Sequence, residues 1–165
     1  MLQKKISMLG SFSVGKTSLV KRFVESIFSE KYLTTVGVKI DKKLISVSGQ
    51  DLTLMLWDLY GEDEYQKIRM SYLRGASGYF LVADGTRATT LDKALAIEQE
   101  AGTHFGPLPC VVALNKCDLT EQWEITSERE AEVKSRARDV VRTSAKTGEG
   151  VEFAFEILAK AMMAP

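Results

Sequence analysis

The sequence is poor in the features that mark secreted or membrane-spanning proteins. Its 165 residues include only 2 cysteines, 3 prolines and 1 histidine. Cys110 and Cys117 are too few for a disulfide framework, so we interpret both as reduced cytosolic thiols. No apolar run reaches the roughly 20 residues that a membrane span requires. These absences predict a globular, cytoplasmic protein.

Charge of one sign is also lacking, because 22 Lys and Arg residues balance 22 Asp and Glu residues. This balance argues against a nucleic-acid partner or a broad contact with anionic membrane. Leu2 excludes a myristoylation signal, and the final AKAMMAP contains no prenylation box. We therefore expect no direct lipid anchor. The length predicts a single domain over residues 1–165.

Apolar segments of strand length alternate with segments of helical spacing. Strands are expected at 4–9, 38–47, 52–59, 78–84, 109–115 and 139–144, and helices at 16–26, 91–105, 127–138 and 151–163. The strand at 38–47 alternates with lysines, which suits a sheet edge, and Ser48-Gly49-Gln50-Asp51 has the composition of a tight turn. The alternation predicts a three-layer α/β fold. Its sheet would have six strands, mostly parallel, with one antiparallel edge strand.

Two of the expected helices carry their own local signals. Ser127 and Glu130 match a capping box that would open a helix running to about Arg138. The last helix places Val151, Phe155, Leu158 and Met162 near one stripe, as a core-facing helix does. Ligands of such sheets bind at the carboxyl ends of the strands, so we expect the chemistry in the loops after strands 1, 3, 5 and 6.

A phosphate-binding loop follows the first expected strand. Residues 10–17 read GSFSVGKT, a match to G-x(4)-G-K-[ST] between a strand and a helix. Its backbone N–H groups and the start of the helix would surround a phosphate chain. Gly15 would let the backbone come close, Lys16 would reach the β and γ oxygens, and Thr17 would offer its hydroxyl to Mg²⁺. The plain alternative is an ordinary glycine-rich turn.

Two short motifs at the ends of later strands favour guanine. The first is Asn115-Lys116-Cys117-Asp118 and the second is Thr143-Ser144-Ala145-Lys146. The Asp118 carboxylate would accept hydrogen bonds from the N1–H and exocyclic amine of guanine, whereas adenine presents an acceptor at N1. The backbone N–H of Ala145 would donate to the guanine carbonyl. Each motif alone also suits a polar turn.

Together these motifs resemble the small GTPases of the Ras superfamily, over the whole chain and most closely the Rab-like branch. GSFSVGKTS, TTVG, WDLYGED, NKCD and TSAK stand in the order of that family. The resemblance implies a P-loop GTPase domain with about five helices, GTP or GDP as ligand, and Mg²⁺ as cofactor. It also implies partners: an exchange factor, a GTPase-activating protein and effectors, bound through loops near 29–37 and 60–71.

The resemblance assigns roles position by position. The implied nucleotide-binding residues are Gly10, Ser13, Val14, Gly15, Lys16, Thr17, Ser18, Phe28, Thr35, Gly61, Asn115, Lys116, Asp118, Ser144, Ala145 and Lys146. The implied metal-holding residues are Thr17, Thr35 and Asp58, and the implied catalytic residues are Glu62 and Lys16.

Three of these residues keep plain alternatives, because Thr35 suits a loop end, Phe28 suits core packing and Asp58 suits a strand-end cap.

Departures from the family pattern cluster where the γ-phosphate would lie. Phe12 stands where the family usually has a small residue, Tyr60 stands before Gly61 where a small Ala is usual, and Glu62 replaces the usual Gln. Glu62 would either act as a general base or repel the γ-phosphate. The sequence thus supports a GTP-hydrolysing switch, with a nucleotide-loaded binding module of negligible turnover as the alternative. An ATP-using kinase fits poorly, since NKCD and TSAK would have no role in it.

An arginine could supply positive charge at the reaction centre. The first of the two implied partner-binding loops contains no Arg between Ile27 and Ile40. Arg69, Arg74 and Arg87 are interpreted as surface residues that pair with carboxylates or face solvent. His104 has no partner at ligand spacing and is interpreted as a surface residue at a helix end.

Overall fold

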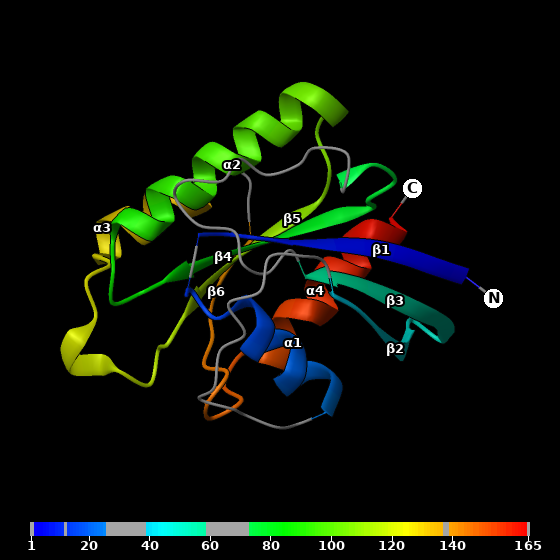
Figure 1. The fold of residues 1–165 in the computed structure, drawn as a ribbon, viewed down its shortest axis with the longest axis horizontal. Coiled ribbons are helices and arrows are strands. Elements are labelled where there is room, and N and C mark those ends of the chain that lie inside the picture. The colour runs from blue at the N-terminus through cyan, green and yellow to red at the C-terminus, as the bar shows by residue number, and fades with distance from the viewer. Residues whose placement is uncertain (1, 12, 26–38, 59–72, 137–138, 165) are drawn as a thin grey trace.

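A six-stranded sheet with helices on both faces forms the fold (Figure 1). The computed structural model describes residues 2–11, 13–25, 39–58, 73–136 and 139–164. The strands are β1 (Leu2–Leu9), β2 (Lys39–Val47), β3 (Gln50–Asp58), β4 (Gly78–Asp84), β5 (Cys110–Asn115) and β6 (Asp139–Arg142). The helices in the described ranges are α1 (Lys16–Glu25), α2 (Thr89–Phe105), α3 (Ser127–Lys134) and α4 (Val151–Met163), with a 3₁₀ turn η2 (Thr120–Gln122).

The strand order β2-β3-β1-β4-β5-β6 confirms the predicted fold class. All neighbouring pairs are parallel except β2 and β3, and β2 is the edge strand. The hairpin between them turns on Ser48 and Gly49, both with positive φ, and Val47 pairs with Gln50. Such a two-residue turn matches the twist of the flanking strands. The lysine-rich strand β2 lies at the edge of the sheet, which confirms its predicted position.

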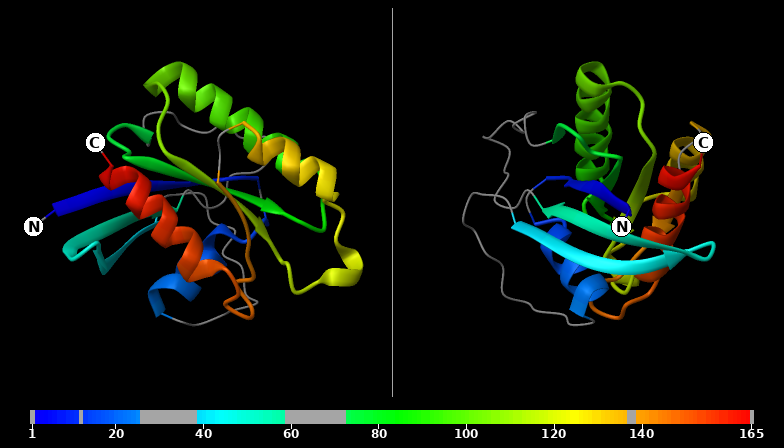
Figure 2. Two further views of the ribbon diagram at one scale, coloured as in Figure 1. Left: turned by 180° about the vertical axis from the view of Figure 1, so that it is seen from behind. Right: turned by 90° about the vertical axis from the view of Figure 1, so that its right-hand side faces the viewer.

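Two hydrophobic layers hold the helices to the sheet, and Figure 2 shows α2 and α4 on opposite sides of it. Helices α1 and α4 pack on one face, while α2 and α3 pack on the other. In the first layer the ring of Phe155 stacks against Phe23 at 4.0 Å and against Phe80 at 4.3 Å between centroids. The whole predicted stripe of α4 is buried, which confirms its core-facing side.

Helix α3 departs from the sequence prediction at both ends. Its N-cap is Thr126, not Ser127, because Thr126 has extended backbone and its hydroxyl accepts from the N–H of Arg129 at 3.1 Å. The predicted capping box is therefore wrong, and Glu130 instead pairs with Arg142 at 2.8 Å. The helix ends at Lys134, before the predicted Arg138, since the N–H of Arg136 bonds three residues back to Val133.

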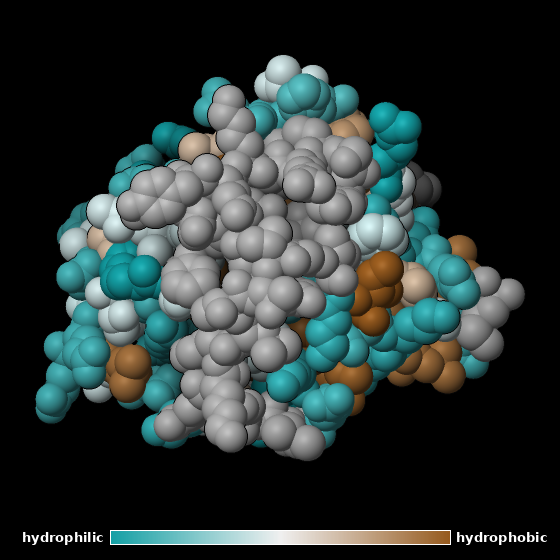
Figure 3. Space-filling model, viewed as in Figure 1, coloured by the Kyte–Doolittle hydropathy of each residue, from teal (hydrophilic) through white to brown (hydrophobic). Residues whose placement is uncertain are grey.

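The face of the molecule seen in Figure 3 is mostly hydrophilic where residues are described, with the hydrophobic ones gathered on the side of β1 and β3. Among the described residues, the exposed large hydrophobic ones are Ile40, Leu44 and Phe153. His104 lies exposed in the last turn of α2. No helix in the described ranges is long and apolar enough to cross a bilayer.

The stacked ring of Phe155 gives a direct test of the core. Phe155→Ala should lower the free energy of unfolding by about 3–5 kcal/mol, because a buried ring leaves a cavity between two aromatic neighbours. Phe153 lies on the same helix and is 58% exposed, so Phe153→Ala should change it by less than about 0.5 kcal/mol. Urea unfolding followed by circular dichroism measures both, and equal losses would contradict the packing.

Candidate functional site

The candidate site lies at the edge of the sheet where the parallel strands end. The structure places fourteen of the predicted site residues at this edge, on a loop, at the helix start or at the last position of a strand: Gly10, Ser13, Val14, Gly15, Lys16, Thr17, Ser18, Asp58, Asn115, Lys116, Asp118, Ser144, Ala145 and Lys146. Strands β3, β1, β4, β5 and β6 are neighbours in that order, so their carboxyl ends stand side by side. Five segments that are remote in sequence thereby reach one edge.

The loop between β1 and α1 is shaped by close backbone approaches. Gly10 has φ +154°, and a Cβ there would lie 2.4 Å from the carbonyl oxygen of Val82. Gly15 has φ +103°, and its Cβ would lie 2.2 Å from Nδ2 of Asn115. Only glycine fits both positions. The buried Lys16 side chain folds back over the loop, and its Nζ donates to the carbonyl of Gly10 at 2.9 Å.

Asn115, at the end of β5, joins three of the segments. Its Nδ2 donates to the carbonyl of Val14 at 3.0 Å. Its Oδ1 accepts from the hydroxyl of Thr143 at 3.2 Å and from the N–H of Ala145 at 3.3 Å. The side chain is 2% exposed, so these bonds are made away from water. One amide therefore sets the spacing between the phosphate loop and both predicted base loops.

The two predicted base loops also contact each other directly. The hydroxyl of Ser144 donates to Oδ1 of Asp118 at 2.8 Å and accepts from the N–H of Thr147 at 3.0 Å. Arg22, on α1, holds the second loop from the other side. Its Nε donates to the carbonyl of Ala145 at 2.7 Å, and its guanidinium also donates to the carbonyl of Lys146. No local sequence pattern indicates this role of Arg22.

Thr17 and Asp58 form a polar pair between α1 and the end of β3. The hydroxyl of Thr17 donates to Oδ2 of Asp58 at 2.6 Å. The second oxygen, Oδ1, is buried and has no hydrogen-bond partner among the described residues. Burial raises the pKa of Asp58, and the Thr17 bond and the charge of Lys16 only partly offset it. A buried carboxylate oxygen left unpaired in this way suits a bound cation.

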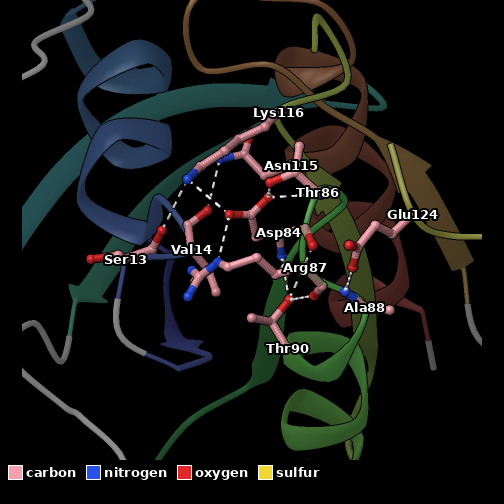
Figure 4. A network of polar contacts seen from close by, with 10 residues as sticks. All are labelled: Ser13, Val14, Asp84, Thr86, Arg87, Ala88, Thr90, Asn115, Lys116 and Glu124. Carbon is pink, nitrogen blue, oxygen red and sulfur yellow. Dashed lines mark hydrogen bonds and ion pairs between the residues drawn. The ribbon is translucent and has the colours of Figure 1, made fainter. Parts of the chain in front are cut away.

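A fifth segment, the loop after β4, also belongs to the site, and we did not predict it. Figure 4 shows Asp84 at its centre, between Lys116 and Arg87. Oδ2 of Asp84 lies 2.9 Å from Nζ of Lys116 and 3.0 Å from Nε of Arg87. Lys116 also donates to the carbonyl of Ser13 at 3.2 Å. The signal that could have revealed Asp84 is its place at the end of a strand buried on both faces.

Arg87 is paired with a carboxylate, as predicted, and this pair with Asp84 lies at the edge of the candidate site. Other predicted positions lie outside the described residues, namely Phe12, Phe28, Thr35, Tyr60, Gly61, Glu62, Arg69 and the loops near 29–37 and 60–71. Among the described residues, no group of three or more His, Cys, Asp or Glu side chains is placed to hold a metal. A cation here would therefore need hydroxyl, water or phosphate oxygens beside Asp58.

The fold and the site define a nucleotide-binding α/β protein of the P-loop class. A model of the Ras family matches residues 5–164. The chain is 31% identical over 153 residues to "Ras-related protein Rab-4" of Dictyostelium discoideum. The matched region covers 92% of this chain and 75% of that protein. The chain is 31% identical over 162 residues to "Ras-related protein Rab-10" of Caenorhabditis elegans, covering 97% and 81%.

The chain belongs to the Ras family of small GTPases and is Rab-like. These matches confirm the resemblance that the five sequence motifs indicated. Members of this family are GTP-binding switch proteins.

Cys117, inside the first base loop, offers a pH-dependent test of this geometry. Its thiol donates to Oε2 of Glu149 at 3.6 Å. Burial, together with the charge of Glu149, raises the pKa of Cys117 to about 11. Only the thiolate reacts, so at pH 8 iodoacetamide should modify Cys117 about 100-fold more slowly than an ordinary thiol, with a rate that rises about tenfold per pH unit.

Trypsin separates Cys117 from Cys110, so mass spectrometry follows each thiol. Glu149→Gln should speed the reaction of Cys117, since it removes the neighbouring charge. Unfolding in urea should bring both thiols to the same rate. Fast alkylation of Cys117 in the folded protein at pH 8 would contradict the described loop.

Proposed function

We propose that the chain is one GTPase domain over residues 1–165 that binds GTP or GDP with Mg²⁺ at this edge. The observation that carries the proposal is the buried Asn115 side chain, which holds the phosphate loop and both base loops together. A site built this way receives a base and a phosphate chain at a fixed separation. The switch would act through the loops near 29–37 and 60–71.

The phosphate end of the ligand would lie against residues 10–18. Backbone N–H groups of this loop and the N-terminus of α1 favour a negatively charged group. Lys16 is already folded over the loop, where its ammonium would meet the β and γ oxygens. Gly15 keeps the backbone near Asn115, so the same residue serves the loop shape and the link to β5.

Guanine would be selected by Asp118. Ser144 donates to Oδ1 of this carboxylate and so holds it in one orientation. Asp118 would accept from the N1–H and the exocyclic amine of guanine, and adenine would leave it opposed by an acceptor. Lys116 would lie along the base and ribose, with the Ala145 N–H toward the guanine carbonyl.

Magnesium would be held by the Thr17 hydroxyl and, through water, by Asp58, with Thr35 as a further ligand from outside the described residues. Oδ1 of Asp58 is buried and lacks a hydrogen-bond partner within the described ranges, so it would be available to a cation or its bound water. When bound, Mg²⁺ neutralises phosphate charge. The hydrogen bond from Thr17 to Asp58 would keep the Thr17 hydroxyl beside this magnesium site.

Hydrolysis would be attack of water on the γ-phosphate, with Lys16 neutralising charge and Glu62 orienting or activating the water. Phe12, Tyr60 and Glu62 instead favour a second candidate, a nucleotide-loaded binding module with negligible turnover. Under either candidate, effectors, an exchange factor and a GTPase-activating protein would read the switch loops. A cytoplasmic location remains a prediction from composition.

Base selection is tested by replacing the carboxylate of Asp118 with an amide. Asp118→Asn should lose the preference for GDP over ADP, because the amide presents donors where the guanine donors point. Competition of each nucleotide against a fluorescent GDP analogue measures the preference. Asp92→Asn, on the exposed side of α2, is the control and should keep it. Full GDP selectivity in Asp118→Asn, or ADP binding as tight as GDP binding in the unaltered chain, would contradict the proposal.

Turnover is tested by single-turnover cleavage of GTP in the unaltered chain and in Phe12→Gly. If the benzyl group obstructs the attacking water, cleavage should be slow in the first and faster in the second. Rapid cleavage in the unaltered chain would eliminate the binding-module candidate. Equal, slow cleavage in both would assign the block to Tyr60 or Glu62 and reject Phe12 as its cause.

A further inference from the structure

Arg22 connects α1, the helix that follows the phosphate loop, to the second base loop, which leads into α4 (Figure 1). Its Nε donates to the carbonyl of Ala145 at 2.7 Å, and its Nη2 donates to the carbonyl of Lys146. These two carbonyls belong to consecutive peptide groups of the loop. One planar guanidinium therefore holds two neighbouring units of the backbone, as its rigid fork of donors allows.

The first of these peptide groups offers a hydrogen-bond donor on its other side. The described chain contains no cis peptide bond, so each carbonyl and the N–H that follows it point in opposite directions. Because its carbonyl is bonded to Arg22, the Ala145–Lys146 peptide directs the N–H of Lys146 away from the guanidinium. No described residue accepts from this N–H. The N–H of Ala145, by contrast, donates to Oδ1 of Asn115 at 3.3 Å.

The second peptide group is held from both sides. The carbonyl of Lys146 accepts from Arg22. On the other side of the same peptide, the N–H of Thr147 donates to the hydroxyl of Ser144 at 3.0 Å. That hydroxyl donates in turn to Oδ1 of Asp118 at 2.8 Å. The loop that carries the Lys146 N–H is therefore tied to the carboxylate that would read guanine.

We propose that Arg22 is a positioning residue for base recognition, which holds the Ala145–Lys146 peptide so that its N–H donates to the C6 carbonyl of a bound guanine. The inference rests on the proposed function, since it needs guanine at Asp118. In guanine the C6 carbonyl lies beside N1, on the side away from the exocyclic amine. A base bonded to Asp118 would thus present this carbonyl beside the carboxylate, where the loop of Ser144 lies.

The guanidinium would strengthen the bond to guanine in two ways. A cation on the carbonyl polarises the peptide group, which makes its N–H a better donor. Held in one direction, the N–H is also ordered before the nucleotide arrives, so binding does not have to order it. Without Arg22 the two carbonyls would turn to water, and both advantages would be lost.

Two substitutions of Arg22 and one of its neighbour separate this role from a general loss of charge. Arg22→Met removes the guanidinium and keeps an apolar stem beside Gly148, where a Cβ would lie 3.8 Å from Cδ of Arg22. Arg22→Lys keeps the charge but replaces the fork with one compact donor group. Lys21→Met is the matched control, because it removes a positive charge from the same helix and Lys21 makes no bond to the loop among the described residues.

Competition against a fluorescent GDP analogue measures the affinities for GDP, IDP and 6-thio-GDP. IDP keeps the C6 carbonyl but lacks the amine, whereas 6-thio-GDP keeps the amine and carries sulfur, a weak acceptor, at C6. The unaltered chain should therefore bind 6-thio-GDP more weakly than GDP.

The three nucleotides should respond differently to the loss of the guanidinium. Arg22→Met should weaken binding of GDP and of IDP about five- to tenfold, as expected for one hydrogen bond, and that of 6-thio-GDP by less than about twofold. Arg22→Lys should give smaller losses in the same order. Lys21→Met should change all three affinities by less than about twofold.

The comparison isolates the effect that passes through the loop, because any other contact of Arg22 would act on the three nucleotides alike. Equal losses for all three in Arg22→Met, unchanged GDP affinity in that variant, or an equal loss of GDP affinity in Lys21→Met would overturn the inference. If Arg22→Met does not fold, the same inequality is required of Arg22→Lys, and equal losses there would overturn it. Failure of the unaltered chain to bind GDP is a separate result, which would refute the proposed function itself.

Discussion

The candidate site depends on one buried amide, the side chain of Asn115. It donates to Val14 and accepts from Thr143 and Ala145, so three loops meet at a single group. Each of these bonds is made out of contact with water, where an unpaired partner would cost about 1–3 kcal/mol. Gly15 lies so close that no other residue fits beside the amide. The phosphate loop and the base loops are consequently one structure, not three.

The sheet and its core place this amide where it can act. Parallel pairing of β1, β4, β5 and β6 brings their carboxyl ends to one edge, and α1 and α4 pack beneath them around Phe155. Arg22 extends from α1 to the carbonyl of Ala145, which ties the helix after the phosphate loop to the second base loop. The order of the strands in the sheet thus determines which loops lie beside one another at the site.

Much of this arrangement was predictable because it follows from local patterns. The turn at Ser48 and Gly49, the lysine-rich edge strand and the buried stripe of α4 each depend on periodicity or turn chemistry within a few residues. The motifs around Lys16, Asn115 and Ser144 were also placed at the correct edge.

The parts that were missed depend on partners distant in sequence. Arg22 lies 123 residues from Ala145, and no local pattern distinguishes it from a surface arginine. Asp84 ends a strand whose following loop lacks a familiar motif. The N-cap was assigned one residue late because Thr126 and Ser127 both suit that position, and only the backbone geometry chooses between them.

Hydrogen–deuterium exchange, compared with GDP and with ADP in the presence of Mg²⁺, tests the central claim most directly. The account predicts slowed exchange in residues 10–18, 115–118 and 143–146 together with GDP, and little change with ADP. Protection of only one of these segments, or equal protection by ADP, would contradict a single guanine-nucleotide site at this edge of the sheet.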